Sequence, residues 1–460
     1  MKKILLALTA AVALSSCGLY SKYEGQGAVS ENLYGSRSDE ATKLLSRDTT
    51  NMMGNISWRE IFTDVKLQRL IEQALEKNTN VRTAVLNVEN AQTALKTARL
   101  AYMPSLAVSA TGSVSGLLEG GGATKTYTVP LSAAWEVDIF GKLRNDKERA
   151  KMVAEQTVFV EQAVRAGVVS AVANLYYTLS LLDGQIEITT QTMKSWGESV
   201  TTAKAMKEAG YLNEAGVAQI EAGLLGVESG LSSLKEARKE AENALCSILA
   251  TTPQSITVAP LNRVAIPERL SVGVPLQLLS SRPDVMAAEA ALAASFYSEN
   301  MARAAFYPSI SLSGTLGWTN DIGVVVNPAE FIYSAVGSLV QPIFTRGLTR
   351  AQLDIAKRTF EQSRMSFEQT LLDSGIEVNS ALAKLSYANG RAGNYTEQVR
   401  MLSRAEQSTK LLMEHGSTTY LEVLTAQQTL YSAQLQRVNN LYEQISAMVS
   451  LYSALGGGRF

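Results

Sequence analysis

A motif that occurs twice limits what this chain can fold into. Residues 98–110 read ARLAYMPSLAVSA and residues 302–314 read ARAAFYPSISLSG, with Pro308 following Pro104 by 204 residues. Each copy begins like a helix, reaches the proline and continues as a strand in which apolar and polar residues alternate. Other landmarks keep almost the same spacing: 204 residues separate Phe140 from Phe344, and 206 separate Gly210 from Gly416. Because a repeat of this length is a duplication rather than a solenoid, the chain is predicted to contain two copies of one unit of about 200 residues.

The repeat defines the expected organisation of the chain. We expect a signal peptide at 1–16, an N-terminal extension at 17–60, a first structural repeat at 61–252, a proline-rich linker at 253–283 and a second structural repeat at 284–460. Each repeat should contain a helix, two strands and a helical hairpin. The strands are predicted at 104–118 and 126–139 and at 308–319 and 330–343, with the hairpin tips near residues 210 and 416. The helix that opens the first repeat is predicted to run from about Asp64 to Tyr102.

Two proline-free stretches point to unusually long helices. Residues 131–252 and 343–460 contain none of the ten prolines, so nothing there forces a helix to end. A helix from Gly141 to Gly210 has 69 residue-to-residue steps and would reach about 100 Å, whereas ordinary helices make about three turns. The apolar residues in this stretch keep a spacing that suits coiled packing. Such helices are expected to lie side by side with others of the same length.

The predicted strands have one apolar face and one polar face. The stretches 105–114 and 309–318 alternate apolar residues with serine and threonine, and the return strand at 126–139 alternates in the same way. Residues assigned to the polar face include Ser105, Ser109, Glu136, Asp138, Ser309, Ser311 and Ser313. Strands of about ten residues with this pattern and with aromatic residues near their ends are typical of an outer-membrane β-barrel. A soluble half-buried sheet alternates in the same way and remains the alternative.

Four strands per chain cannot close a barrel by themselves. An open sheet edge in hydrocarbon leaves backbone groups without partners, and each such group costs several kcal/mol. Several copies of the chain would therefore have to share one barrel. Two copies would supply eight strands with a filled interior, whereas three would supply twelve strands and room for water. In either case the polar-face residues are expected to line the lumen.

The first residues resemble a bacterial lipoprotein signal. Lys2 and Lys3 precede an apolar run from Ile4 to Leu14, which is too short to span a bilayer, and LSSC at 14–17 ends at a cysteine. This pattern predicts that Cys17 is acylated and becomes the first residue of the mature chain. A secreted protein with a chance cysteine is the alternative. The second cysteine, Cys246, is expected to be a buried helical thiol.

Composition argues against several other classes of protein. A net charge of −1 gives no electrostatic reason to expect nucleic acid. After the signal there is no run of 18 apolar residues, so no transmembrane helix is expected. The single histidine, His415, and the absence of nucleophile or phosphate-loop motifs argue against an enzyme, and no cofactor or metal site is expected. Glu136 and Asp138 could imitate a glycosidase pair, but a lumen position explains them more simply.

Seven stretches together resemble one known family over nearly the whole mature length. They are WREIF at 58–62, AWEVDIFGKLR at 134–144, LLSSRPDVMAAEAAL at 278–292, ARAAFYPSISLSGTLG at 302–317, QPIFTRG at 341–347, HGSTTYLEVLTAQQTLY at 415–431 and LYSALGGG at 451–458. In this order they resemble the TolC-like outer-membrane efflux ducts, in their lipoprotein branch.

The resemblance implies a fold, an assembly and a location. The implied fold is a membrane β-barrel plus a long α-helical coiled bundle, in which a homotrimer shares a 12-stranded barrel and a helical tunnel. The trimer would be anchored by lipid in the outer membrane and project into the periplasm. A periplasmic adaptor protein and an inner-membrane pump would complete a tripartite exporter that supplies the energy. The duct itself would passively conduct drugs or other small molecules, as in multidrug resistance pumps.

The resemblance also assigns roles at the hairpin tips. The tips near Gly210 and Gly416 would form the periplasmic entrance. In similar ducts two acidic residues on the second tip constrict the pore. Glu422 matches the first acidic position, but the second is Thr425 here. Tyr211 and Tyr420 would close the entrance by hydrogen bonding or would pack between helices.

Two further functions remain open from the sequence. The chain could be the duct of a metal-ion or type I secretion exporter, although its 13 methionines are scattered and it has one histidine, which gives copper export no support. It could also be a periplasmic scaffold lipoprotein that conducts nothing. A scaffold predicts a monomer without ion conductance.

Overall fold

The computed structural model describes residues 20–25, 56–116, 122–264, 282–322 and 324–458. The predicted signal peptide and Cys17 lie outside the described residues. The chain divides into two compact units. The sheet unit comprises Met1–Gly27, Leu86–Val158 and Ala287–Gln369, and the hairpin unit comprises Ala28–Val85, Phe159–Met286 and Thr370–Phe460. Two helices of 67 residues each, α6 (Lys142–Glu208) and α10 (Leu348–Glu414), begin in the first unit and end in the second, which confirms the prediction of very long helices.

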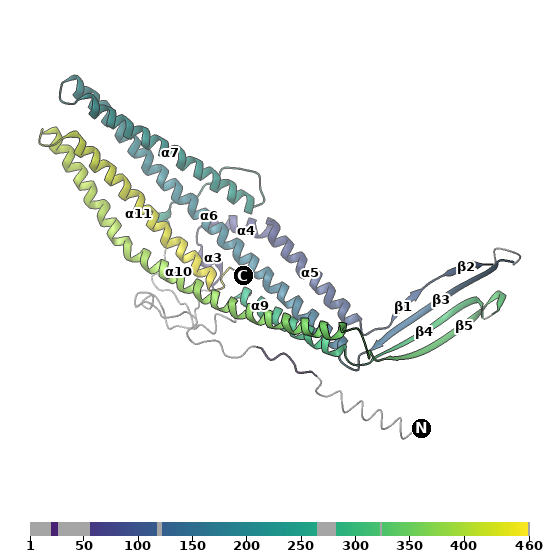
Figure 1. Ribbon diagram of the computed structural model, residues 1–460. Coiled ribbons are helices and arrows are strands. Elements are labelled where there is room, and N and C mark those ends of the chain that lie inside the picture. The colour runs from purple at the N-terminus through teal and green to yellow at the C-terminus, as the bar shows by residue number, and fades with distance from the viewer. Residues whose placement is uncertain (1–19, 26–55, 117–121, 265–281, 323, 459–460) are drawn as a thin grey trace. The chain divides into compact units, whose positions relative to one another are not determined.

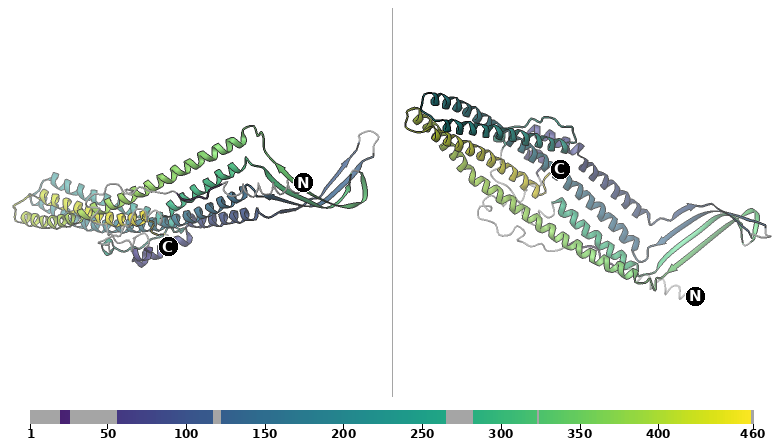
Figure 2. Two further views of the ribbon diagram at one scale, coloured as in Figure 1. Left: turned by 90° about the horizontal axis from the view of Figure 1, so that it is seen from below. Right: turned by 45° about the horizontal axis from the view of Figure 1, so that its top comes forward.

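The sheet unit is built around one antiparallel sheet (Figure 1). Its strands are β1 (Ser105–Val108), β2 (Thr111–Ser115), β3 (Thr124–Val137), β4 (Ser309–Asp321) and β5 (Val325–Val340). Their order is β1-β3-β4-β5, and β2 pairs with the same strand as β1. The strands of this sheet curve together (Figure 2). Helix α5 (Thr79–Leu100) precedes β1 and helix α9 (Pro283–Ala304) precedes β4, while α6 and α10 follow β3 and β5.

The stretch predicted as one strand at 104–118 is interrupted after Val108. The Ser109 N–H donates to the Pro130 carbonyl at 3.2 Å, but Pro130 has no N–H with which to return the bond. The register is the same on both sides of the interruption, where Val108 faces Leu131 and Thr111 faces Thr128. A proline in the neighbouring strand therefore explains why one line of residues is split into β1 and β2.

The register keeps the apolar and polar residues of neighbouring strands on matching faces. On the apolar face, Leu131, Leu316 and Tyr333 form one row, and Val129, Trp318 and Phe331 form the next. The polar face carries rows such as Ser132, Thr315 and Ser334. The apolar face is exposed in the single chain, with Leu106, Val108, Leu316, Trp318, Phe331, Tyr333 and Leu339 all more than a third accessible. Within the described residues, β1 with β2 forms one edge of the sheet and β5 forms the other.

The hairpin unit contains two helical hairpins. α6 is followed by α7 (Glu214–Ile248), and α10 is followed by α11 (Tyr420–Ala454) (Figure 1). Shorter elements complete the unit: α3 (Trp58–Ile61), α4 (Val65–Lys77) and the 3-10 turn η2 (Leu261–Arg263).

The helix predicted from Asp64 to Tyr102 is two helices that meet at Asn78. α4 ends at Lys77 and α5 begins at Thr79. The Asn78 side chain accepts a bond from the Asn80 N–H at 2.9 Å and donates one to the Ile248 carbonyl at 2.9 Å. Asparagine competes with the helix for backbone hydrogen bonds in this way, so this residue ends one helix and caps the next.

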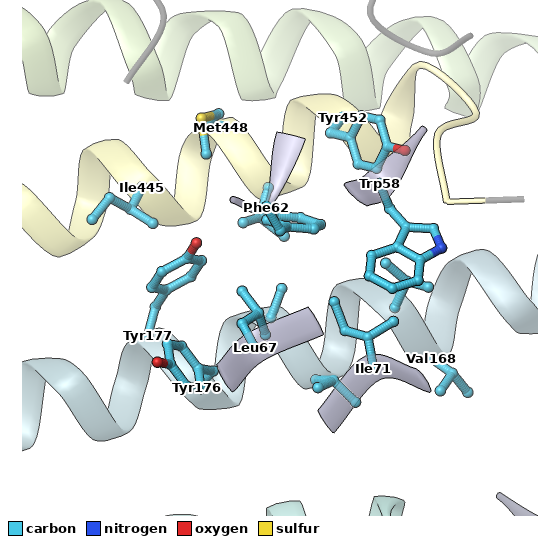
Figure 3. Close-up of a cluster of buried hydrophobic side chains, with 14 of the residues drawn as sticks. Trp58, Phe62, Leu67, Ile71, Val168, Tyr176, Tyr177, Ile445, Met448 and Tyr452 are labelled. Carbon is cyan, nitrogen blue, oxygen red and sulfur yellow. The ribbon is translucent and has the colours of Figure 1, made fainter. Parts of the chain in front are cut away.

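The core of the hairpin unit gathers around the short helices α3 and α4 (Figure 3). Trp58, Phe62, Leu67 and Ile71 are fully buried there. They pack with side chains of α6 and α11, which include Val168, Tyr176, Tyr177, Ile445, Met448 and Tyr452. Removing a buried ring such as that of Phe62 would cost about 3–5 kcal/mol.

Helix α6 is long and apolar enough to cross a bilayer by length and composition alone, although the sequence predicted no transmembrane helix. Its apolar residues Val169, Val172 and Tyr176 are buried in the core of the hairpin unit. Core packing accounts for part of the apolar character of this stretch, since 28% of the apolar window is buried inside the single chain. Cys246 is buried as a free thiol, as predicted.

Two buried charged residues, Arg282 and Glu242, make hydrogen bonds that connect segments of the hairpin unit. Arg282 donates to Asp284 at 2.6 Å, to Glu377 of α10 at 2.8 Å and to the Ala454 carbonyl at the end of α11 at 2.7 Å. Glu242 of α7 accepts from Arg238 at 2.5 Å, from Lys239 at 3.3 Å and from the Ile256 N–H at 3.0 Å. Burial by itself would raise the pKa of Glu242, but these donors hold its pKa at about 2.

Candidate pore lining and entrance

The two hairpin tips turn in the same way. Gly210 and Gly416 have φ angles of 78° and 71°, a conformation that favours glycine. The Gly210 N–H donates to the Lys207 carbonyl and the next N–H to the Met206 carbonyl, and the corresponding bonds form at the second tip. Both turns therefore satisfy the carbonyls at the end of a long helix. The repeated glycine is a requirement of the backbone at each tip.

The turn at the first tip is stabilised by local polar contacts. The Asn213 side chain caps α7 by accepting from the Gly216 N–H at 2.9 Å. Lys207 and Glu214 form an ion pair across the turn. Tyr211 is 81% exposed, so its ring is available at the surface of the tip.

The second tip leaves its acidic residue at the surface. Thr419 stands at the cap position of α11 but makes no side-chain capping bond. Glu422 is exposed in the first turn of α11 and accepts a hydrogen bond from the Thr418 hydroxyl. A carboxylate is favoured at the positive end of a helix. The Thr425 hydroxyl donates to the carbonyl of Leu421 at 2.9 Å, so it stays on the α11 backbone.

Tyr420 is part of the packing between helices. It is 5% exposed, and its hydroxyl donates to the Ser199 carbonyl of α6 at 3.0 Å. Its ring belongs to a buried cluster with Trp196, Val217, Ile220 and Leu424. The single chain therefore shows Tyr420 packing between helices, and a role in closing the entrance stays a prediction.

Sequence reasoning missed a tight contact in this cluster. A Cβ atom on Gly223 of α7 would lie 1.8 Å from the ring of Trp196, so only glycine fits beneath that ring. A glycine inside a long helix was the available signal, because it costs stability unless close packing requires it.

The residues predicted to line the lumen share one face of the sheet, with one exception. Ser311 faces Glu136, Ser313 faces Ala134, and Ala134 also faces Ser105. Ser309 lies on this face at the start of β4, and Ser109 lies at the interruption between β1 and β2. Hydroxyl pairs join neighbouring strands on the same face: Ser113 with Thr126 at 2.7 Å, Thr128 with Thr319 at 2.8 Å, and Thr315 with Ser334 at 2.7 Å.

Asp138 is the exception, because it lies beyond the end of the strand. β3 ends at Val137, and the Asp138 carboxylate accepts from the N–H groups of Leu143 and Arg144 at 3.0 and 2.8 Å. It therefore caps the N-terminus of α6, where backbone N–H groups lack partners. Glu136 remains on the strand and pairs with Lys142 at 3.1 Å.

A short N-terminal segment lies against the helices of the sheet unit. A Cβ atom on Gly141 would lie 3.4 Å from the Tyr20 ring, and the ring centroids of Tyr23 and Phe296 are 5.8 Å apart. The Tyr20 and Tyr23 hydroxyls are buried and lack a hydrogen-bond partner. Burial raises the pKa of both residues to about 12. Their rings, rather than their hydroxyls, make this contact.

The described residues contain no group of three or more histidine, cysteine or acidic side chains that could hold a metal ion. What the arrangement offers is a hydroxyl-rich sheet face and two exposed helical tips.

Comparisons with known proteins bear on this arrangement. A model of the family "Outer membrane efflux protein" matches residues 70–251 and 274–457. The cation efflux system protein CusC of Escherichia coli (strain K12) is 31% identical over 409 residues, which cover 88% of this chain and 89% of CusC. A CusC crystal structure aligns with a TM-score of 0.83 at 28% identity and covers 96% of this chain and 100% of the other.

Two further relatives have similar coverage. The "Probable outer membrane lipoprotein SilC" of Salmonella typhimurium is 27% identical over 415 residues, 89% of each chain. The "Probable efflux pump outer membrane protein TtgC" of Pseudomonas putida (strain KT2440) is 30% identical over 416 residues, 87% of this chain and 85% of TtgC.

Proposed function

Because the chain belongs to the outer membrane efflux protein family and is an outer-membrane efflux channel, we propose that three copies form one passive exit duct. The observation that carries this proposal is the sheet itself. Its apolar face is exposed and its two edges carry no neighbouring strand in the described chain. Such a sheet is stable in a bilayer only if the edges of several copies pair and the apolar face meets lipid.

The dimensions of the sheet fit this arrangement. From Tyr127 to Val137, β3 covers ten residue steps, about 34 Å along the strand. At the tilt of about 40° that is usual in outer-membrane barrels, this length spans about 26 Å, close to the height of their apolar band. Three copies supply twelve strands and an interior wide enough for water. The hydroxyl-rich face, including Ser309, Ser311 and Ser313, would line that interior.

The duct would act with partners that provide the energy. The family is one of transport channels rather than enzymes. We propose a periplasmic adaptor protein and an inner-membrane pump as partners, which deliver the solute to the helical tips. The homotrimer would contribute only a path through the outer membrane.

Glu422 is the proposed gate residue at the periplasmic entrance. Glu422 is exposed six residues after Gly416, so a trimer would carry three such carboxylates, one per copy, near the tips of the second hairpins. Like charges that approach one another repel and favour proton uptake. Thr425 would supply a hydroxyl one turn further along, while Gly210 and Tyr211 would shape the neighbouring tip.

A lipid anchor on Cys17 would hold the duct in the inner leaflet of the outer membrane. Tyr20 lies three residues after Cys17, so the chain between them spans about 10 Å at most. The Tyr20 ring lies near Gly141, just after the end of β3, since a Cβ atom built on Gly141 would be 3.4 Å from it. The acyl chains would therefore enter the membrane close to the sheet. The name of SilC, an outer-membrane lipoprotein, supports the same anchor.

The cargo is proposed to be small solutes chosen by the pump. The name of CusC describes cation efflux, and that of TtgC describes an efflux pump. The hydroxyl pairs on the sheet face offer weak, general polar contacts, which suit a duct of broad specificity. A metal-ion exporter is the second candidate because of the likeness to CusC.

Ion conductance in planar bilayers tests the proposal. The purified protein should conduct, and Glu422→Ala should raise the conductance because three negative charges leave the entrance. The difference should shrink in 1 M salt, where the Debye length falls to about 3 Å. Glu214→Ala is the matched control, since that carboxylate is paired with Lys207 on the first tip. A protein that inserts but does not conduct would favour the scaffold, and equal conductance of wild type and Glu422→Ala would remove the gate assignment.

A further inference from the structure

The junction between β3 and α6 is covered by a residue from the neighbouring strand. Phe140 follows β3, and its ring stacks on that of Tyr307 with centroids 5.1 Å apart and an angle of 14° between the planes. Tyr307 directly precedes Pro308 and β4. At the end of the β3–β4 pairing, Phe140, which follows β3, thus stacks on Tyr307, which precedes β4.

The corresponding junction after β5 has no such cover. Ile343 and Phe344 are 95% and 84% exposed. At the repeat spacing of 204 residues, Phe344 matches Phe140 and Met103 matches Tyr307. Met103 is 66% exposed, and it precedes β1 at the opposite edge of the sheet. Met103 and Phe344 are therefore both exposed, and within one chain they lie at opposite edges of the sheet, with β3 and β4 between those edges.

We propose that the β5 edge of one copy pairs with the β1–β2 edge of a second copy in the register of the β3–β4 pairing, with Phe344 covering the partner's Met103. The inference rests on the proposed shared barrel and adds its register. In the β3–β4 pairing, Trp135 faces Leu312. To transfer this register to the interface, each β3 residue is replaced by the residue 204 positions later and each β4 residue by the residue 204 positions earlier. Leu339 then lies opposite the partner's Val108, and Ser334 lies opposite the partner's Ser113.

This register matches the chemistry of both edges. Leu339 lies in a row with Ile310, and Val108 in a row with Leu131, so both belong to the apolar face. Ser334 already pairs with the Thr315 hydroxyl at 2.7 Å and Ser113 with that of Thr126 at 2.7 Å. The Ser334–Ser113 contact would continue these hydroxyl pairs across the interface.

One competing register also keeps the faces matched. The two hairpins of the sheet differ by two residues, since Ser309 faces Val340 in β4–β5 whereas Ser105 faces Ala134 in β1–β3. A shift of two residues would place Ser334 opposite the partner's Ser115 and leave every side chain on its face. We choose the first register because Ile139-Phe140 and Ile343-Phe344 are 204 residues apart, the spacing on which that register is built.

Cysteine pairs test the register directly. Ser113 and Ser334 are on opposite edges of one sheet, so within a chain they are separated by at least three strand spacings, about 14 Å, which exceeds the reach of a disulfide. Any disulfide in the Ser113→Cys/Ser334→Cys variant must therefore join two copies. After mild oxidation in the membrane, we expect covalent trimers on a non-reducing gel. The matched control, Ser115→Cys/Ser334→Cys, should remain uncrosslinked.

The outcomes separate this inference from the proposed function. Each variant is first checked for its mass in detergent under reducing conditions. A trimer that crosslinks through Ser115→Cys, or through neither pair, would overturn the register and leave the shared barrel standing. A folded monomer would overturn both. The single variant Ser334→Cys should give no covalent trimer. This control tests whether the new cysteine forms a disulfide with a native cysteine.

Discussion

Phe140 and Phe344 hold the same place in the two repeats, but their surroundings differ. The first is covered by Tyr307 within its own chain, and the second is almost fully exposed. A Cβ atom built on Gly141, the residue after Phe140, would lie 3.4 Å from the Tyr20 ring, whereas nothing lies within 4 Å of a Cβ atom built on Gly347. In the sheet unit, this junction of the first repeat is therefore covered inside the chain, whereas the same junction of the second repeat is exposed and is proposed to meet a neighbouring copy.

The hairpin tips differ in a similar way. The first tip has a side-chain cap from Asn213 and an ion pair between Lys207 and Glu214. The second lacks the cap at Thr419 and exposes Glu422. At the tips, the first repeat therefore has its polar groups paired within the chain, and the second repeat exposes the groups proposed to meet a partner or the solute.

The largest expected effect concerns a charge that only the first hairpin has. Glu242 is buried in α7, and the matching position of α11, 206 residues later, is Met448. The pKa of Glu242 is lowered from 4.5 to about 2. Its ionised form therefore stabilises the fold above about pH 4.5, and this contribution of up to about 3 kcal/mol is lost as the pH falls toward 2. Urea unfolding should show this loss in the wild type but not in Glu242→Gln, which should be less stable at neutral pH.

The contact between Trp196 and Gly223 is the next feature that separates the hairpins. Gly223→Ala should displace the ring from its buried cluster and destabilise the protein by about 1–3 kcal/mol. The matching residue of the second hairpin is Thr429, which is exposed, so Thr429→Ala should change stability by less than about 0.5 kcal/mol. Thermal unfolding followed by circular dichroism measures both. Equal losses would mean that the first hairpin has no special packing.

Replacing Phe344 by alanine should affect the trimer, whereas replacing Phe140 should affect the fold of the single chain. Phe344→Ala should weaken the trimer by about 1–2 kcal/mol per interface, the value of a partly buried ring, without lowering the unfolding temperature of the hairpin unit. Phe140→Ala should destabilise the sheet unit of each chain. The temperature at which the trimer dissociates on a gel gives the first effect. If Phe344→Ala leaves it unchanged, the exposed junction is not part of the interface.

The smallest effect concerns the N-terminal segment. Lys22 lies between the two docked tyrosines, Tyr20 and Tyr23. Replacing both by alanine should free the segment and speed trypsin cleavage after Lys22, which mass spectrometry detects. Replacing both by phenylalanine should leave the rate near that of the wild type, because the hydroxyls have no partner. Equal rates in all three proteins would show that the tyrosines do not hold the anchor segment.

Features that depend on one stretch of sequence could be predicted well. The proline-free stretches gave the long helices, and alternation assigned Ser311 and Ser313 to the correct face. The split between β1 and β2 could not be predicted, since it depends on Pro130 lying opposite Ser109 in a strand that pairs from elsewhere in the chain. The break at Asn78 depends likewise on the distant Ile248 carbonyl.

The site residues show the same division. Asp138 continues the polar alternation of β3, but α6 begins four residues later, and backbone N–H groups of its first turn donate to the Asp138 carboxylate. Tyr420 resembled a gate residue by position, and its burial depends on Trp196 and Ser199 of another helix. Glu422 and Tyr211 are exposed at the tips, where the resemblance placed them, and their roles in closing the entrance stay predictions.

The native mass of the protein extracted in detergent gives the number of chains in one particle. A shared barrel anchored by lipid predicts three mature chains, each heavier than its sequence from Cys17 onward by the acyl groups. Such a mass would support the shared barrel and the anchor together. A folded, stable monomer would contradict the shared barrel, because the exposed apolar face and the two open strand edges would then need another explanation.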